Sequence, residues 1–220
     1  MELNDAIGNQ LGLGYGSYGL GSIHMHEEDL KNARSCFKRA QEIFEKLSVF
    51  QMVTACRLML ADIHLQLDEY AEAREIMDGL DREALSPGNL SDMKYLVGRL
   101  DMMEFPSDED VLKVAVKTFR DVIASTDTHS SVDLSRYYTA LVGGLTLLDA
   151  GDASLKALAE GAEKLAERLG KVSKYSVRNS LMTRREIKDF LALCEKMELP
   201  FPPEGYDLKV VDSAKRQEDR

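Results

Sequence analysis

The sequence predicts an all-α protein, an α-solenoid of about four antiparallel helical hairpins followed by a C-terminal capping helix. Three observations support this fold class. Strand signals are few, because β-branched alternating runs are scarce and no Asn-Gly hairpin turn occurs. Apolar residues recur at three- and four-residue intervals, which places them on one helix face. Segments of the chain also resemble one another at a fixed spacing, which is typical of helical repeats.

Length and composition fit a folded cytoplasmic protein. The chain has 220 residues, of which 44% are hydrophobic and 30% are charged. No apolar run approaches the roughly 18 residues that span a bilayer, and the start, MELNDAIGNQ, lacks the pattern of a secretory signal. The net charge of −10 argues against nucleic acid as a partner. Three widely spaced cysteines, Cys36, Cys56 and Cys194, indicate a reducing compartment.

The first two hairpins are predicted from self-similarity. When the chain is shifted by 40 residues, segment 20–40 overlays segment 60–80. The identical pairs are Leu20 with Leu60, Ile23 with Ile63, His24 with His64, Ala33 with Ala73 and Arg34 with Arg74. These pairs occupy positions at which the two helices of a hairpin would pack, so each segment is expected to form one hairpin.

The same spacing organises the rest of a repeat domain over residues 1–199. The hairpins are expected at about 5–47, 49–83, 88–125 and 131–170, the third being degenerate and carrying an insertion, EFPSDED. A capping helix is expected at about 181–198, opened by a capping box from Thr183 to Glu186 and followed by prolines. Residues 200–220 are expected to be a mobile polar tail.

The repeated pattern resembles the tetratricopeptide repeat (TPR) family. That family places a leucine and a small residue late in helix A, with small and large apolar residues at fixed distances in helix B. The matching positions are Leu20, Gly21, Ala33 and Phe37 in the first unit, Leu60, Ala61, Ala73 and Met77 in the second, and Val142, Gly143, Leu155 and Ala159 in the fourth. The spacing is near 40 rather than 34 residues, which resembles extended repeats of signal-transduction ATPases and transcription activators.

The stretch GLGYGSYGLG raises the question of a nucleotide site, because it contains the GxGxxG pattern. A phosphate loop needs a strand before the glycines, and none is predicted there. A glycine stripe on a helix is the favoured interpretation, since Gly8, Gly12, Gly16 and Gly19 are spaced by four, four and three residues. We expect these residues to form a bare face, on which another helix or a second copy of the chain could pack.

Other residues offer little for catalysis or metal binding. His24 and His26 point to different sides of a helix, so they are not expected to share a metal ion. The equivalence of His24 and His64 favours a packing role for both. No cysteine has a catalytic neighbour in sequence. The sequence therefore predicts a non-enzyme without catalytic residues, metal or cofactor.

The TPR resemblance implies a concave groove lined by helix A, in which a peptide or amphipathic helix would bind. Carried over to this sequence, the groove residues are Tyr15, Tyr18, Ser22, Met25, Leu58, Asp62, Leu65, Tyr95, Arg99, Met102, Tyr137 and Leu147. Some of these residues could equally belong to the core between helices. The aromatic and methionine side chains among them would suit an apolar or amphipathic partner.

A local basic patch departs from the acidic balance of the chain. It consists of Lys171, Lys174, Arg178, Arg184, Arg185 and Lys188. The patch is either a solvated helix surface or a docking site for an acidic partner. Taken together, the resemblance implies a protein–protein interaction or scaffold module, which could form part of a larger signalling protein. The alternative is a regulatory domain that senses a small molecule or peptide, and an enzyme with its own nucleotide site is the least favoured function.

Overall fold

A computed structural model describes residues 2–125, 131–172 and 180–205 of the chain. These residues form helices and connecting turns, and no strand occurs among them. The chain divides into two compact units, Met1–Thr118 and Phe119–Arg220, so the boundary falls inside helix α6 (Glu109–Ala124). The all-α fold with consecutive helices paired confirms the predicted fold class.

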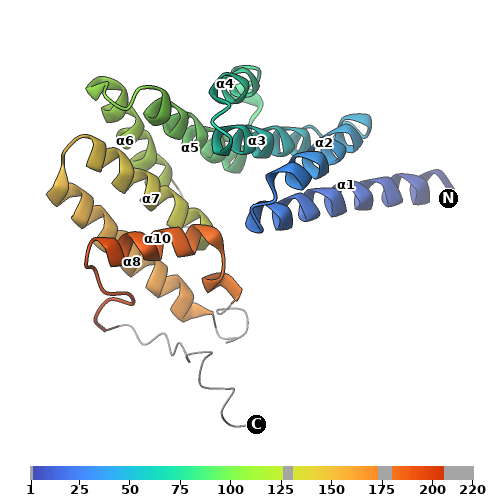
Figure 1. Cartoon of the computed structure of the whole chain (residues 1–220). Helices are drawn as coiled ribbons and strands as arrows, with labels where there is room; N and C mark the ends of the chain where they lie inside the picture. Colours follow the sequence, from blue (N-terminus) through green and yellow to red (C-terminus); the bar gives the residue numbers. More distant parts are fainter. Residues whose placement is uncertain (1, 126–130, 173–179, 206–220) are drawn as a thin grey trace, which may run out of the picture. The chain divides into compact units, whose positions relative to one another are not determined.

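Unit 1 is a row of packed helices (Figure 1). Its elements are α1 (Glu2–His26), α2 (Leu30–Lys46), α3 (Phe50–Gln66), α4 (Tyr70–Asp78), the 3₁₀-helix η1 (Arg82–Ala84), α5 (Pro87–Glu104) and the first part of α6. Consecutive helices from α1 to α5 contact each other, and α3 also contacts α5. We call α1, α3 and α5 the A-type helices and α2 and α4 the B-type helices.

Helix α2 forms the centre of the first hairpin because its apolar residues share one face. Ala33, Phe37, Ala40 and Phe44 are all 0% exposed, and Asp29 caps the helix by accepting a hydrogen bond of 3.1 Å from the amide of Asn32. Phe37 packs against Leu60 and Ile63 of α3, and Phe44 packs against Cys56, which is also on α3. Helix α2 is thus held between α1 and α3.

The same backbone turn joins the two helices of three hairpins. Glu28, Asp68 and Asp149 each adopt the left-handed conformation, with φ of 61°, 58° and 55°. In each turn, the amide of the following residue donates a 2.9 Å hydrogen bond to the carbonyl five residues before it. The connection from α5 to α6 differs, because Asp108 caps α6 there by accepting hydrogen bonds from two backbone amides at 3.1 Å.

Unit 2 contains α7 (Ser131–Leu147), α8 (Gly151–Lys171) and α10 (Arg185–Lys196), and α7 packs against both α8 and α10. Gly161 of α8 is needed for this packing. A Cβ atom at that position would lie 2.7 Å from Cγ of Tyr138 and 3.0 Å from Cζ of Phe190. Close packing of α8 therefore depends on the missing side chain.

The start of α10 differs from the sequence prediction. Arg184 occupies the N-cap position without a side-chain cap, and the Thr183 hydroxyl donates to the carbonyl of Ser180 at 2.8 Å. The predicted capping box from Thr183 to Glu186 is therefore wrong. The apolar stripe of the helix is nevertheless buried, since Ile187, Phe190 and Cys194 are at most 1% exposed.

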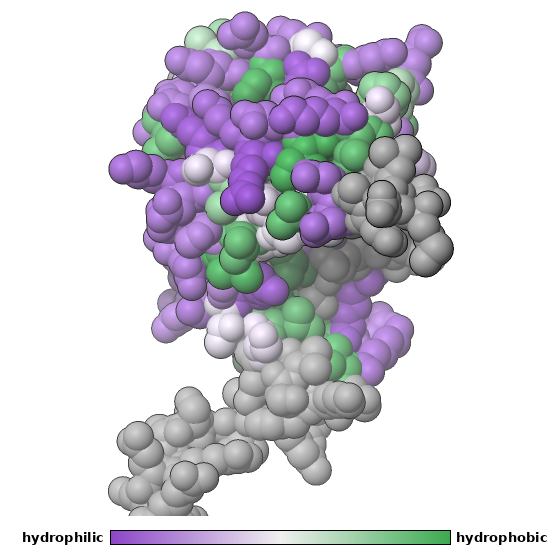
Figure 2. Space-filling view, turned by 90° about the vertical axis from the view of Figure 1, so that its right-hand side faces the viewer, coloured by the Kyte–Doolittle hydropathy of each residue, from purple (hydrophilic) through white to green (hydrophobic). Residues whose placement is uncertain are grey.

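Exposed side chains are mostly polar, and the face drawn in Figure 2 is mainly hydrophilic with smaller hydrophobic areas between the charged residues. Several large apolar side chains are exposed all the same. Three of them, Leu13, Leu20 and Ile23, lie on α1 and are 42%, 54% and 51% exposed. Scattered apolar residues are normal on a protein surface, but three on one helix need an explanation.

Candidate interaction site

Four of the predicted groove residues are core residues. Leu58 and Leu65 of α3 are 1% and 0% exposed, Tyr95 of α5 is 6% exposed, and Tyr137 of α7 is 1% exposed. Helix α3 contacts α2, α4 and α5, which leaves little of its circumference open. The sequence expectation that these four side chains line a groove is therefore corrected.

The groove residues of α1 are more accessible. Tyr15 is 49% exposed, although the edge of its ring meets Phe44 with a centroid distance of 5.2 Å. Tyr18 is half-buried and meets Phe37 in the same manner at 5.3 Å. The Ser22 hydroxyl donates to the Tyr18 carbonyl at 3.2 Å. This edge of α1 thus combines rigid aromatic rings with one exposed tyrosine.

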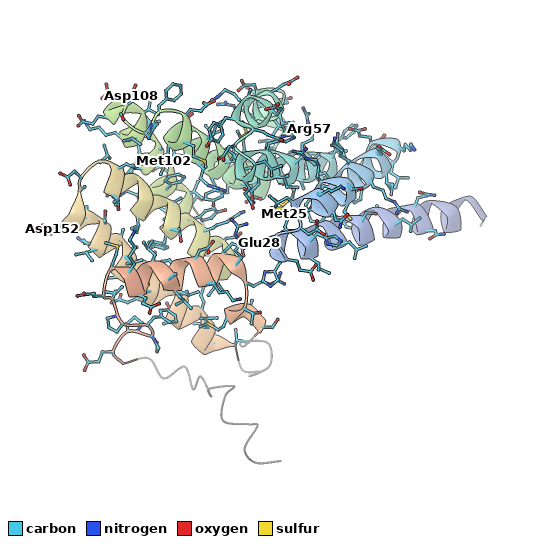
Figure 3. The ribbon with its side chains drawn as sticks, viewed as in Figure 1. Met25, Glu28, Arg57, Met102, Asp108 and Asp152 are labelled. Carbon is cyan, nitrogen blue, oxygen red and sulfur yellow. The ribbon has the colours of Figure 1, made fainter. Side chains whose placement is uncertain are left out.

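Met25 and Met102 lie near the C-terminal ends of two A-type helices, α1 and α5 (Figure 3). Both side chains are half-buried, and Met25 packs against the apolar cluster around Phe37. Methionine side chains are flexible and polarizable, which lets them adapt to different apolar partners.

An ion pair links α3 and α5 within unit 1. Arg99 donates to the Asp62 carboxylate at 2.8 Å, and its guanidinium lies 5.5 Å from the centre of the Tyr95 ring. Burial disfavours the charged form of Arg99, but Tyr95 and Asp62 outweigh that effect, so the pKa of Arg99 lies above its ordinary value. The pair fixes neighbouring A-type helices and presents a partly exposed charge between apolar residues.

The remaining groove residue of α7, Leu147, and the basic patch belong to unit 2. Leu147 is 46% exposed at the end of α7. In the patch, Lys171 bonds to Glu167 at 2.6 Å, whereas Arg185 pairs with Asp189 at 3.6 Å. Arg184 and Lys188 are exposed. Lys174 and Arg178 lie outside the described residues, so the patch is seen only in part.

Sequence reasoning missed the ionic contacts between repeats. Arg34 of α2 donates to the Glu69 carboxylate, and its guanidinium lies 3.3 Å from Nδ1 of His64. Its repeat equivalent, Arg74 of α4, bonds to Glu104 and, at 2.9 Å, to Asp101 of α5. Each B-type helix thus places an arginine on the end of the next A-type helix.

These contacts affect the ionisation of Glu69. Burial opposes its charged form, but hydrogen bonds from Arg34 and His64 outweigh burial and hold the pKa of Glu69 below its ordinary value. The identity of Arg34 and Arg74 at a spacing of 40 residues was the signal that could have revealed these ionic contacts.

The glycines of α1 serve two purposes. A Cβ atom at Gly14 or Gly21 would lie 2.9 Å from a ring atom of Phe44 or Phe37, so these two glycines permit close packing of α2. Around Gly12, Gly16 and Gly19, by contrast, nothing lies within 4 Å of an added Cβ. Gly8 belongs to α1, but the space around it is outside the described part of the structure. The part of the predicted stripe formed by Gly12, Gly16 and Gly19 is therefore an open face among the described residues.

The described residues offer limited chemistry. No cluster of three or more His, Cys, Asp or Glu side chains able to hold a metal ion is found among them. Burial raises the pKa of the Cys56 thiol to about 12 and that of Cys194 to about 11, which makes both poor nucleophiles. A cavity of about 210 Å³ lies beside α5, and its lining includes Leu90, Lys94 and Val97. Among the described helices, none has the length and apolar content that a bilayer crossing requires.

The paired helices, the recurring turn and the repeated inter-repeat arginine define a helical-repeat protein. The family model named tetratricopeptide repeat matches residues 17–46, which cover the last ten residues of α1 and all of α2. Residues 17–46 thus resemble a tetratricopeptide repeat, and the described residues form a TPR-like array of paired helices. Comparisons with curated proteins and with solved structures find no match.

Proposed function

We propose that the chain is a non-catalytic interaction module that binds a peptide or amphipathic helix along the A-type helices of unit 1. The observation that carries this proposal is that all three A-type helices bear accessible side chains at groove positions: exposed Tyr15 and half-buried Met25 on α1, Asp62 of α3 paired with Arg99 of α5, and half-buried Met102 on α5. We call these residues the Tyr15–Met102 row. Repeat arrays of this kind use extended surfaces to bind other proteins.

The chemistry of this row favours a partner with both apolar and polar groups. Tyrosine contributes a large, rigid contact area. Methionine is flexible and can adapt its shape to the partner. The side chains of Arg99 and Asp62 are 23% and 14% exposed, so they can still reach a polar group of the partner. An extended or helical peptide meets such a mixed surface better than a small metabolite does.

Sensing of a small molecule is the second candidate. The cavity beside α5 supports it, because apolar residues and Lys94 line the same space. Its volume of about 210 Å³ is below the range of about 300–1,000 Å³ that ligand pockets usually have. We therefore place this function behind the interaction function.

Site-specific photo-crosslinking tests the proposal. A benzophenone amino acid at position 15 or 102 should crosslink to a polypeptide in cell extract, because both positions flank the proposed surface. The matched control is position 38, where Lys38 is exposed on α2. Equal crosslinking at position 38, or none at 15 and 102, would contradict the proposal. A thermal-shift screen of metabolites tests the alternative, with Lys94→Met as the variant that should abolish any shift.

A further inference from the structure

Helix α1 has a second surface that the proposed function does not use. We call it the outer face of α1, and it consists of Gly12, Leu13, Gly16, Gly19, Leu20 and Ile23. Its apolar side chains are 42% to 54% exposed, and its glycines have open space beyond them. Within unit 1, α2 packs on the other side of α1 (Figure 1). The outer face is therefore apolar and uncovered among the described residues of unit 1.

The second repeat shows what covers the equivalent face. Leu60 and Ile63 of α3 are the repeat equivalents of the outer-face leucine and isoleucine, and they are identical in type. They are only 5% and 0% exposed, because Ala33 and Phe37 of α2 pack on them. The outer face of α1 is thus the face with which an A-type helix receives the B-type helix of a neighbouring repeat.

The glycines widen this face. Cys56 of α3 packs against Ala40 and Phe44 of α2, and its repeat equivalent on α1 is Gly16. A helix on the outer face would meet bare backbone at that position and could lie closer or carry bulkier side chains. Aromatic residues at the positions of Phe37 and Phe44 would fit such a face.

An ionic contact has its counterpart at the end of α1 as well. In the second repeat, Nδ1 of His64 lies 2.6 Å from the Glu69 carboxylate, and Arg34 donates to that same carboxylate. In the first repeat, Nδ1 of His24 lies 3.7 Å from the carboxylate of Asp29, at the same spacing along the chain. Among the described residues, no arginine or lysine forms an ion pair with His24 or Asp29, and Lys31 acts on Asp29 only at longer range. The charge of Asp29 would complement an arginine on an incoming helix.

The B-type helices of unit 1 are not free to supply that helix, because α2 and α4 each lie between two A-type helices. A second copy of the chain would have to unfold to offer either one. We propose that the outer face of α1 binds an amphipathic helix of the α2 type from a protein partner, with two aromatic residues seven positions apart and an arginine three positions before the first. This surface is separate from the Tyr15–Met102 row.

A peptide with the sequence of residues 29–47 is the probe, because it carries the pattern that α3 already accepts. Fluorescence anisotropy with the full chain should show saturable binding. The double variant Leu20→Asp, Ile23→Asp should weaken binding by about tenfold or more, because it places charge in the apolar contact. The peptide variant Arg34→Ala should weaken binding by about threefold to tenfold, and this change leaves the protein untouched.

Val114 is 60% exposed on α6, so Val114→Asp is the matched control and should bind the peptide as the wild-type chain does. Circular dichroism should show equal helicity for all protein variants. Absence of binding, or equal binding to the Leu20→Asp, Ile23→Asp variant, would overturn the proposal. Faster amide hydrogen exchange in α2 on peptide addition would also overturn it, because it would show that the peptide takes the place of α2 in the first hairpin. A dimer lost with the double variant would assign the face to a second copy instead.

Discussion

Two glycines of α1 that are five residues apart, Gly16 and Gly21, should respond in opposite ways to the same substitution. Alanine at Gly16 adds a methyl group with nothing within 4 Å. The helix gains about 0.5–1 kcal/mol from the better helix former. Alanine at Gly21 has the same intrinsic gain, but its Cβ would lie 2.9 Å from two ring atoms of Phe37.

The Phe37 ring has little room to move, because it is 0% exposed and packs against Leu60 and Ile63. Overpacking of a core costs about 1–3 kcal/mol. We therefore expect Gly16→Ala to stabilise the protein by up to about 1 kcal/mol and Gly21→Ala to be neutral or destabilising by up to about 2 kcal/mol after the intrinsic gain is subtracted.

Urea denaturation followed by circular dichroism measures this difference, since the chain has no tryptophan. Thermal melting gives a second measure, with a shift of about 2–8 °C for each kcal/mol. Gly12→Ala serves as a replicate on the open side. If Gly16→Ala destabilised the protein as much as Gly21→Ala, the outer face of α1 would have to be covered, and the reasoning would be refuted.

Three further outcomes are expected. Iodoacetamide at pH 8 should label the half-buried Cys36 and should spare Cys56 and Cys194 until the protein unfolds, because burial raises the pKa of both thiols. Mass spectrometry identifies the labelled sites, and early labelling of either buried thiol would contradict the packing. The ionised form of Glu69 favours the folded state, so its contribution to stability should be present above its ordinary pKa and be lost as the pH falls through its lower folded-state pKa. Urea titrations at several pH values should show that the free energy of unfolding falls less steeply with acid for Glu69→Gln than for wild type. Equal slopes would argue against the contact of Glu69 with Arg34 and His64. Arg74→Ala should destabilise the protein by about 1 kcal/mol, less at high salt, and a salt-independent loss would point to packing rather than charge.

The B-type helices were the easier part to predict from sequence. Ala33, Phe37, Ala40 and Phe44 fall on one face because α2 is amphipathic, and all four are buried. The 40-residue spacing also identified the repeated hairpins, since it matches the recurrence of the left-handed turn at Glu28 and Asp68.

The buried residues of the A-type helices could not be predicted in the same way. Helix α3 contacts α2 on one side and α4 on the other, so its apolar residues surround the helix instead of forming a single stripe. Periodicity therefore could not separate Leu58 and Leu65, which are core residues, from Asp62 between them, which remains accessible. Long-range partners such as Arg99 for Asp62 depend on how neighbouring repeats stack, and one sequence carries little information on that.

The left-handed turn has a counterpart after α10. Glu198 has φ of 57°, and the amide of Leu199 donates to the carbonyl of Cys194 at 2.8 Å, as in the turns that follow α1, α2, α3 and α7. Pro200, Pro202 and Pro203 follow where the next helix would begin, and each proline disfavours helical backbone in the residue before it. Helix α10 thus ends in the same turn as the helices of the repeats, and the prolines after it oppose the start of another helix at that point.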